Sequence, residues 1–316
     1  MNVLHAILAV TARVTTPILL ASTGAIYSER SGLPNITLDA AMILGAFSAV
    51  YGSYFYANVW AGVIYAMLAG TLVGILYALI CVFMGGDATV VGVSFNLIAW
   101  GLTTFLLPVI FNARGSFVSP QIQSLDKITL PLLNQIPLVG GVFSDQTIIT
   151  YFSWLFVFIT WLVLFHTKPG MQIRACGENP QAAATVGFNV SVTRFVCSGI
   201  TGMMCGLAGA HLSLGLMTMF SEKMTAGRGF IALAAVTYAK ASPKKVLFIS
   251  LIFGFADALS NQLQLFGWPS YLILMVPYLF VVMFVVIDPF FQKLSLKKKK
   301  AAYLCDIKRS DTPLEH

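Results

Sequence analysis

Charged residues are scarce in this chain: of its 316 residues, 10% are charged and 58% are hydrophobic, and the mean hydropathy is +0.83. Soluble domains contain about 25% charged residues, so this composition excludes an ordinary soluble domain and indicates a polytopic membrane protein. The net charge is +7. The basic residues are not interleaved with aromatic residues in one polar domain, and no nucleic-acid-binding module is recognisable, so we expect no nucleic-acid partner.

Several chemical signatures are missing from the sequence. It contains no GxxxxGK[ST] phosphate-binding loop, so the chain is not itself an ATPase. It contains no GxSxG or HExxH motif, so nothing supports an intramembrane hydrolase. None of its five cysteines forms a CxxC pair, which argues against a disulfide framework and against a metal site.

The sequence does contain many apolar runs, and most are long enough to cross about 30 Å of hydrocarbon. We therefore predict an all-α, polytopic transmembrane helix bundle of about nine spans, including broken or short helices. The seventh run is short, which predicts a tilted, broken or re-entrant segment. The first run lacks a basic leader and exceeds the core of a signal peptide, so we expect it to be a span. The runs are 6–27, 37–57, 59–83, 89–112, 147–166, 192–214, 229–240, 246–265 and 271–288.

Basic residues predict the orientation, because lysine and arginine accumulate in cytoplasmic loops. We expect 1–292 to form the membrane domain and 293–316 to form a cytoplasmic basic tail, whose last residues resemble a tag remnant. Alternating backwards from that tail predicts an extracytoplasmic N-terminus and an extracytoplasmic 113–146 loop. The inside then receives Arg30, Lys168, Arg174, Arg194, Lys240, Lys244, Lys245 and Lys297 to Lys300, and the outside receives Arg114, Lys127, Lys223 and Arg228.

Small residues recur on two of the predicted spans. Gly70 and Gly74 form a GxxxG motif in the third span, and glycines recur along the sixth at 199, 202, 206 and 209. Close approach of backbones is a main source of helix association in lipid. The pattern therefore predicts a closely packed bundle without indicating its cargo.

A polar segment, 166–192, interrupts the apolar runs and is predicted to be cytoplasmic. Asn179 is a good N-cap, Pro180 fits the first helical position and Gly187 fits the residue after the helix. This predicts a helix of about two turns, which is too short to be stable alone in water. The side chains on its face are small enough for the helix to enter a groove of another protein. A plain connection between two spans is the alternative.

Polar residues near the second span allow two interpretations. Glu29, Asn35 and Asp39 lie between two apolar runs, together with Gly32 and Pro34. Irregular backbone within a bilayer occurs where it lines a polar cavity, which favours a broken helix beside a translocation pathway. A cytoplasmic turn with an arginine anchor is the other interpretation.

Further polar residues lie inside predicted spans. Asp257 and Asn261 share one face of the eighth span, and an acid inside a span is either functional or structurally paired. Asn96 in the fourth span allows pathway lining or packing. We expect Arg13 to be snorkelling or paired, and His211 to be an interior or interfacial histidine.

One stretch of the polar segment resembles a known family. Residues 169–183, PGMQIRACGENPQAA, resemble the cytoplasmic coupling loop of bacterial ABC importer permeases of the ribose and branched-chain amino-acid type. Within that family the resemblance is strongest to nucleoside permeases that work with lipoproteins of the basic membrane protein type. Four further stretches resemble family motifs: 28–36 resembles SERSGVxNIG, 92–102 resembles GLxLNLLALGLT, 227–235 resembles GRGFIALAAVIFG, and 253–259 resembles LFGFADAL.

The sequence also departs from that pattern. The family's NIGLEGMM is NITLDAAM at 35–42, where Thr37 and Ala40 replace glycines and Asp39 replaces glutamate. The stretch after Ala235 also differs from the family's IFGKWNP. The first departure bears on the backbone path at 35–40. It also bears on the identity of the substrate that the resemblance implies.

The resemblance implies a permease subunit of an ATP-driven importer, with nucleosides as the expected cargo, in a bacterial cell membrane. It implies a partner ATPase that binds ATP and Mg, a second permease forming a heterodimer, a substrate-binding lipoprotein, and no cofactor on this chain. The translocation candidates are Glu29, Asn35, Asp39, Asn96, Asp257 and Asn261. The coupling residues, within a loop of about 167–191, are Arg174, Gly177, Glu178, Asn179, Pro180, Ala182, Ala183 and Gly187.

The sequence leaves other functions open. A sugar or a riboflavin-like solute fits the same permease architecture. An ion-coupled secondary transporter would use the intramembrane acids as coupling sites. A membrane enzyme is a third class, for which no catalytic constellation is visible.

Overall fold

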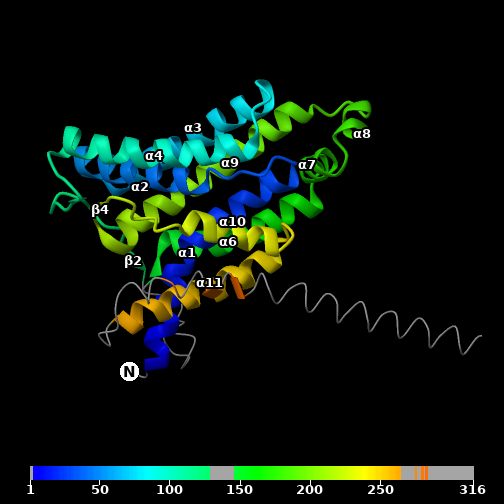
Figure 1. The fold of residues 1–316 in the computed structure, drawn as a ribbon. Helices are drawn as coiled ribbons and strands as arrows, with labels where there is room; N and C mark the ends of the chain where they lie inside the picture. The colour runs from blue at the N-terminus through cyan, green and yellow to red at the C-terminus, as the bar shows by residue number, and fades with distance from the viewer. Residues whose placement is uncertain (1–2, 129–145, 265–274, 276–278, 281, 284–316) are drawn as a thin grey trace, which may run out of the picture.

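The computed structural model describes residues 3–128 and 146–264, and residues 275, 279, 280, 282 and 283. Figure 1 shows the described chain as a bundle of helices, which confirms the predicted all-α class. The strands β1 (Ser116–Phe117), β2 (Lys127–Ile128), β3 (Gln146–Thr147) and β4 (Phe220–Ser221) form two short antiparallel pairs, β1 with β4 and β2 with β3. The helices are α1 (Val3–Arg30), α2 (Leu38–Tyr56), α3 (Val59–Ala78), α4 (Ala88–Phe111), α6 (Ile148–His166), α7 (Lys168–Glu178), α8 (Pro180–Thr185), α9 (Val190–Ala210), α10 (Arg228–Tyr238) and α11 (Pro243–Gln264), with π-helical turns η1 (Leu79–Phe83) and η3 (His211–Met217).

Seven helices of the described chain are long and apolar enough to cross a membrane, rather than the nine predicted. The seventh predicted run is α10, whose 11 residues extend about 16 Å and cannot cross the hydrocarbon. Most of the ninth predicted run, 271–288, lies outside the described residues, as does the basic tail at 293–316.

Polar residues at the turns set the starts of several spans. The side chain of Asn58 accepts from the amide of Trp60 before α3, and that of Asp87 accepts from Thr89 and Val90 before α4. Asn189 likewise accepts from Val192 before α9. Each cap satisfies an amide that would otherwise have no partner at the helix end.

The core of the bundle is the contact of α9 with α2 and α3. A Cβ at Gly70 would lie 2.2 Å from the carbonyl oxygen of Gly202, and one at Gly206 would lie 2.1 Å from that of Ala66. A Cβ at Gly209 would meet the carbonyl oxygen of Met42 on α2 at 2.1 Å. The glycine pattern therefore does mark close helix contacts, although Gly199 takes little part in them.

Two segments interrupt the bundle with irregular backbone. Residues 31–37, between α1 and α2, are non-helical, and Asn35 and Thr37 in this segment are almost fully buried. The segment 218–227 contains β4, which pairs with β1, and ends at α10. Gly229, near the start of α10, packs against the backbone of Asp39 at the start of α2. The seventh predicted run is therefore a short helix that starts inside the bundle.

Basic residues that were predicted to share one membrane side do meet at one end of the bundle. The Arg30 guanidinium donates to the carbonyl oxygens of Ala241 and Lys240, and Arg194 donates to that of Ser31. Helices α7 and α8 lie beyond this end, and β4 lies toward the opposite end (Figure 1). Arg228 was counted among the outer charges, and its side chain is 13% exposed and paired within the bundle.

Candidate functional site

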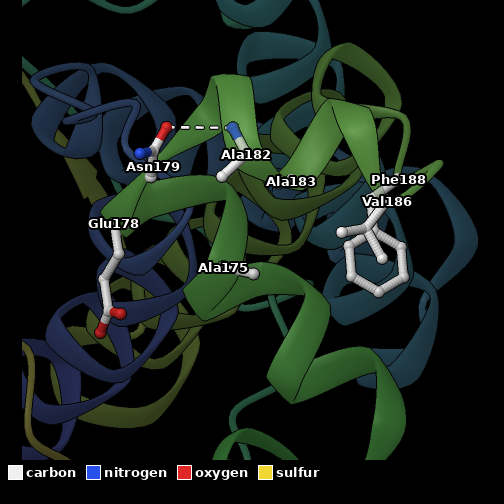
Figure 2. A pocket seen from close by; sticks show the side chains of 7 residues that line it. All are labelled: Ala175, Glu178, Asn179, Ala182, Ala183, Val186 and Phe188. Carbon is white, nitrogen blue, oxygen red and sulfur yellow. Dashed lines mark hydrogen bonds between the residues drawn. The ribbon is translucent and has the colours of Figure 1, made fainter.

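The polar segment 166–192 folds as a helical hairpin of α7 and α8. The Thr167 hydroxyl accepts from the amide of Gly170 at 3.3 Å at the start of α7. The Asn179 side chain accepts from the amide of Ala182 at 3.0 Å and so caps α8 (Figure 2). The end of α8 is closed by the Phe188 amide, which donates to the Ala183 carbonyl, and by Gly187 at φ +93°. These caps satisfy the ends of a helix with only six residues.

Helix α8 confirms the sequence prediction, including the N-cap Asn179, Pro180 at the start and Gly187 after the end. The sequence reasoning missed α7. Gly170 and Gly177 weaken the helical signal of this stretch, since glycine is unfavourable inside helices. Thr167 followed by Pro169 was the available signal, because a threonine cap and an early proline are typical of a helix start.

A groove of about 290 Å³ lies along the hairpin. Figure 2 shows its apolar side chains, Val186 and Phe188, at one side and the carboxylate of Glu178 at the other. Val186 is 75% exposed. The groove is lined by Ala175, Glu178, Asn179, Ala182, Ala183, Val186 and Phe188. Small alanines between an apolar edge and an acid leave room for a side chain from another protein.

The hairpin is joined tightly to the bundle. A Cβ at Gly170 would lie 2.0 Å from the carbonyl oxygen of Val163 on α6, and one at Gly177 would lie 2.1 Å from that of Arg30 on α1. The Gln172 amide donates to the Thr193 hydroxyl on α9 at 3.0 Å. The Arg174 guanidinium lies over the Phe165 ring, 5.2 Å from its centroid. The hairpin therefore contacts α1, α6 and α9 directly.

A second site, inside the bundle, is centred on the carboxylate of Asp39. This group is 1% exposed and accepts hydrogen bonds from the Trp100 indole, the Thr225 hydroxyl and the Gly229 amide, at 3.1, 3.1 and 3.2 Å. The N-cap of α10, Gly227, has no side chain to offer. Asp39 on α2 therefore supplies the cap of α10 from another helix, where negative charge is favoured.

The adjacent residue of α10 is held by a different acid. The Arg228 Nη2 lies 2.8 Å from the Asp257 Oδ2 on α11, and its Nε donates to the same oxygen at 3.0 Å. The side chains are 13% and 11% exposed. Arg228 also donates to the carbonyls of Met224 and Thr225, so the turn before α10 is fixed by the same side chain.

Two asparagines satisfy the irregular backbone before α2. Asn96 on α4 accepts from the Ala40 amide at 2.8 Å and donates to the Ile36 carbonyl at 3.0 Å. Asn35 accepts from the amide and hydroxyl of Thr37 and donates to the Ser198 hydroxyl on α9 at 3.3 Å. Both asparagines are 2% exposed. They replace the hydrogen bonds that a continuous helix would have made.

Four of the six predicted translocation residues therefore belong to one buried region, which we call the inner polar cluster: Asn35, Asp39, Asn96, Trp100, Thr225, Arg228 and Asp257. Glu29 is half-buried near the end of α1, and Asn261 is exposed on α11. The sequence reasoning missed Trp100, Thr225 and the role of Arg228. The signal for Arg228 was its place just before a short apolar run, since a cation within a bundle requires an acid.

A third polar network lies between α1, β3 and η3. The Arg13 Nε donates to the Gln146 Oε1 at 3.3 Å, and the His211 ring contacts the Thr147 hydroxyl at 3.2 Å and the Arg13 carbonyl at 3.3 Å. This confirms His211 as an interior histidine and Arg13 as a paired residue. Among the described residues, no group of three His, Cys, Asp or Glu side chains is arranged to hold a metal ion.

The chain is similar to membrane transport proteins over most of its length. The family model described as branched-chain amino acid transport system / permease component matches residues 7–286. The guanosine ABC transporter permease protein NupQ of Bacillus subtilis is 34% identical over 293 residues, which cover 89% of this chain and 91% of the relative. The nucleoside ABC transporter permease protein NupC of Lactococcus lactis is 34% identical over 296 residues, covering 89% and 92%.

A third relative points to a different solute. The putative glucose ABC transporter permease protein TsgC13 of Haloferax volcanii is 32% identical over 258 residues, covering 80% of this chain and 76% of the relative. No solved structure matches the chain.

Proposed function

The chain belongs to the family of branched-chain amino acid transport system permease components, and on that premise we propose that it is the permease subunit of an ATP-driven ABC importer of nucleosides. Two relatives named for guanosine or nucleoside transport, each aligned over about nine tenths of both chains, support this cargo. The permease contributes a transmembrane path, and ATP with Mg binds to a separate ATPase subunit.

The α7–α8 hairpin is the observation on which the ATP-driven mechanism depends. It is capped at both ends, and it presents a groove of about 290 Å³. Close backbone contacts fix it to α1 and α6, and a side-chain hydrogen bond joins it to α9. We propose that α8 docks into a groove of the ATPase, that an ATPase side chain in turn fills the groove of the hairpin, and that closure of the ATPase on ATP moves the hairpin. Glu178, Asn179, Pro180, Ala182, Ala183 and Gly187 form the contact, while Arg174 and Gly177 fix the hairpin to the bundle.

The inner polar cluster provides a mechanism for alternating access. The start of α10 is held by Asp39 of α2 on one side and by Asp257 of α11 on the other. Both neighbouring connections, 31–37 and 218–227, are irregular and can change direction with less loss of hydrogen bonds than a continuous helix. We propose that α10 and these connections border the pathway. Asn35 and Asn96 stabilise the wall of the pathway, and Glu29 and Asn261 are candidates for lining it.

The remaining components follow from the same proposal. A second permease chain completes the membrane path as a heterodimer, and a substrate-binding lipoprotein delivers solute to the end opposite the hairpin. The hairpin and the C-terminus then lie in the cytoplasm of a bacterial cell.

The second candidate cargo is a sugar, because one relative is named as a putative glucose permease at 32% identity. Uptake of labelled guanosine by cells that express this chain with its partner subunits separates the two. We expect excess unlabelled nucleosides to compete for uptake, and glucose or riboflavin not to compete. Competition by glucose alone would contradict the nucleoside proposal while leaving the ABC mechanism intact.

A further inference from the structure

Two basic side chains from different elements lie over aromatic rings on one face of α6. The Lys244 Nζ, at the start of α11, is 4.9 Å from the centroid of the Trp161 ring. The Arg174 Cζ, on α7, is 5.2 Å from the centroid of the Phe165 ring, one turn further along α6. The Trp161 ring is also 4.6 Å from the His166 ring. We call these five residues the α6 basic–aromatic surface.

This surface continues from the apolar outer face of the same span. Phe158 is 57% exposed, Leu155 54% and Leu162 42%, and the Phe158 ring is 5.8 Å from that of Trp161. On a helix that spans the membrane, exposed apolar side chains point toward the acyl chains of the lipid. Aromatic and basic residues at the end of such a face are typical of the depth at which lipid headgroups lie.

The positive charge of the surface is not neutralised by the described part of the chain. Across the residues that the structure describes, the one ion pair joins Arg228 and Asp257, neither of which belongs to this surface. The Nε of Arg174 is buried and has no hydrogen-bond partner. A cation over an aromatic ring is attracted by the ring quadrupole, but the ring does not cancel its charge. Two cations over aromatic rings that lie one turn apart on α6 favour an anion beside them.

We propose that the α6 basic–aromatic surface binds the phosphate of an anionic phospholipid, in the leaflet where the α7–α8 hairpin lies. Lys244 and Arg174 contact the phosphate, and the acyl chains lie along Phe158 and Leu162. Because Arg174 belongs to α7 and Lys244 to α11, the bound lipid joins the hairpin to two spans. The inference rests on the chain crossing a membrane, and it does not depend on the solute that the chain transports.

Native mass spectrometry of the full-length chain in detergent tests this site with phosphatidylglycerol and phosphatidylcholine as probes. We expect selective retention of phosphatidylglycerol. Lys244→Gln and Arg174→Gln each weaken that retention about fivefold, the effect of one basic residue near an anionic lipid surface, and leave phosphatidylcholine unchanged. Lys244→Arg retains the wild-type preference.

The matched control is Lys127→Gln, which removes an exposed lysine from β2, near the opposite end of the bundle. Because this control keeps the C-terminal basic run, the contribution of that run is the same in every variant. Unchanged phosphatidylglycerol retention in Lys244→Gln would overturn the proposal, and so would an equal loss in Lys127→Gln. Lys244 is exposed, so its variant decides the question even if Arg174→Gln does not fold.

Discussion

At the scale of single residues, the buried acids are the most informative feature of this protein. An ionised side chain within a bilayer is costly unless it is paired or hydrogen-bonded. Asp39 has three donors and Asp257 has an arginine, and both act on neighbouring residues of α10. The acids therefore fix the position of one short helix.

The ion pair gives the first prediction. Asp257→Asn leaves the largely buried Arg228 without its acid, and we expect it to lower the stability of the purified chain by about 3 kcal/mol. Arg228→Gln combined with Asp257→Asn removes both charges and should recover part of the loss. Thermal unfolding in detergent measures both, with Asn261→Ala, an exposed position on the same helix, as the control. A double variant no more stable than the single one would contradict the pairing.

Gly229 gives a second prediction. A Cβ at this position would lie 2.4 Å from the amide nitrogen of Asp39, so Gly229→Ala should separate α10 from α2 and disturb the cap. Overpacking of this kind costs about 1–3 kcal/mol. Gly101→Ala is the matched control, because nothing lies within 4 Å of its added Cβ. Comparable melting temperatures for both variants would show that the close approach is not required.

The sequence identified Asp39, Asn96 and Asp257 as candidates but not what they bind. The hydrophobic pattern of the sequence shows that an acid in an apolar run needs a partner, because the cost of burying the charge depends on the residue itself. The identity of the partner depends on the tertiary fold, because Thr225 and Gly229 are separated from Asp39 by more than 180 residues. The pairing of Arg228 with Asp257 was missed for the same reason.

At the scale of elements, the α7–α8 hairpin links the outside of the bundle to its spans. Local signals were sufficient to predict α8, because the asparagine cap, the proline and the following glycine lie within nine residues of one another. The groove was not predictable, because it requires α7 and the return of the chain at Phe188.

Reversing the charge of the groove gives a third prediction. Glu178→Arg places a bulky cation at the rim of the groove, and we expect ATP-driven uptake to fall at least tenfold while solute binding to the lipoprotein is unchanged. Uptake in membrane vesicles and separate receptor binding measure the two effects. Asp126→Arg, an exposed acid beside β2, is the control. Wild-type uptake by Glu178→Arg would count against a coupling role.

The cap of α8 gives a fourth prediction. Asn179→Ala removes the side chain that accepts from the Ala182 amide, a change that costs about 1 kcal/mol of helix stability. Because α8 is only six residues long, we expect ATP hydrolysis to become partly uncoupled from uptake, with more ATP consumed per solute. Asn179→Asp retains an acceptor and should restore the wild-type ratio. An unchanged ratio in Asn179→Ala would show that the cap does not matter for coupling.

At the scale of the whole molecule, composition alone predicted the class of protein, because apolar length is required to cross a bilayer. The number of spans was less predictable. The apolar run at 229–240 has the composition of a span, but α10 starts inside the bundle, where Asp39 and Asp257 satisfy its polar start. Hydropathy does not detect such a start, since it takes no account of contacts between distant segments.

The proposed drive of this permease by an ATPase, through the α7–α8 hairpin, is open to a direct test. The measurement is guanosine uptake into proteoliposomes that contain this chain, the second permease, the ATPase and the lipoprotein. We expect uptake that requires ATP and the ATPase subunit and that is lost in Glu178→Arg. Uptake by this chain alone, driven by an ion gradient without ATP, would show that the hairpin is not driven by an ATPase.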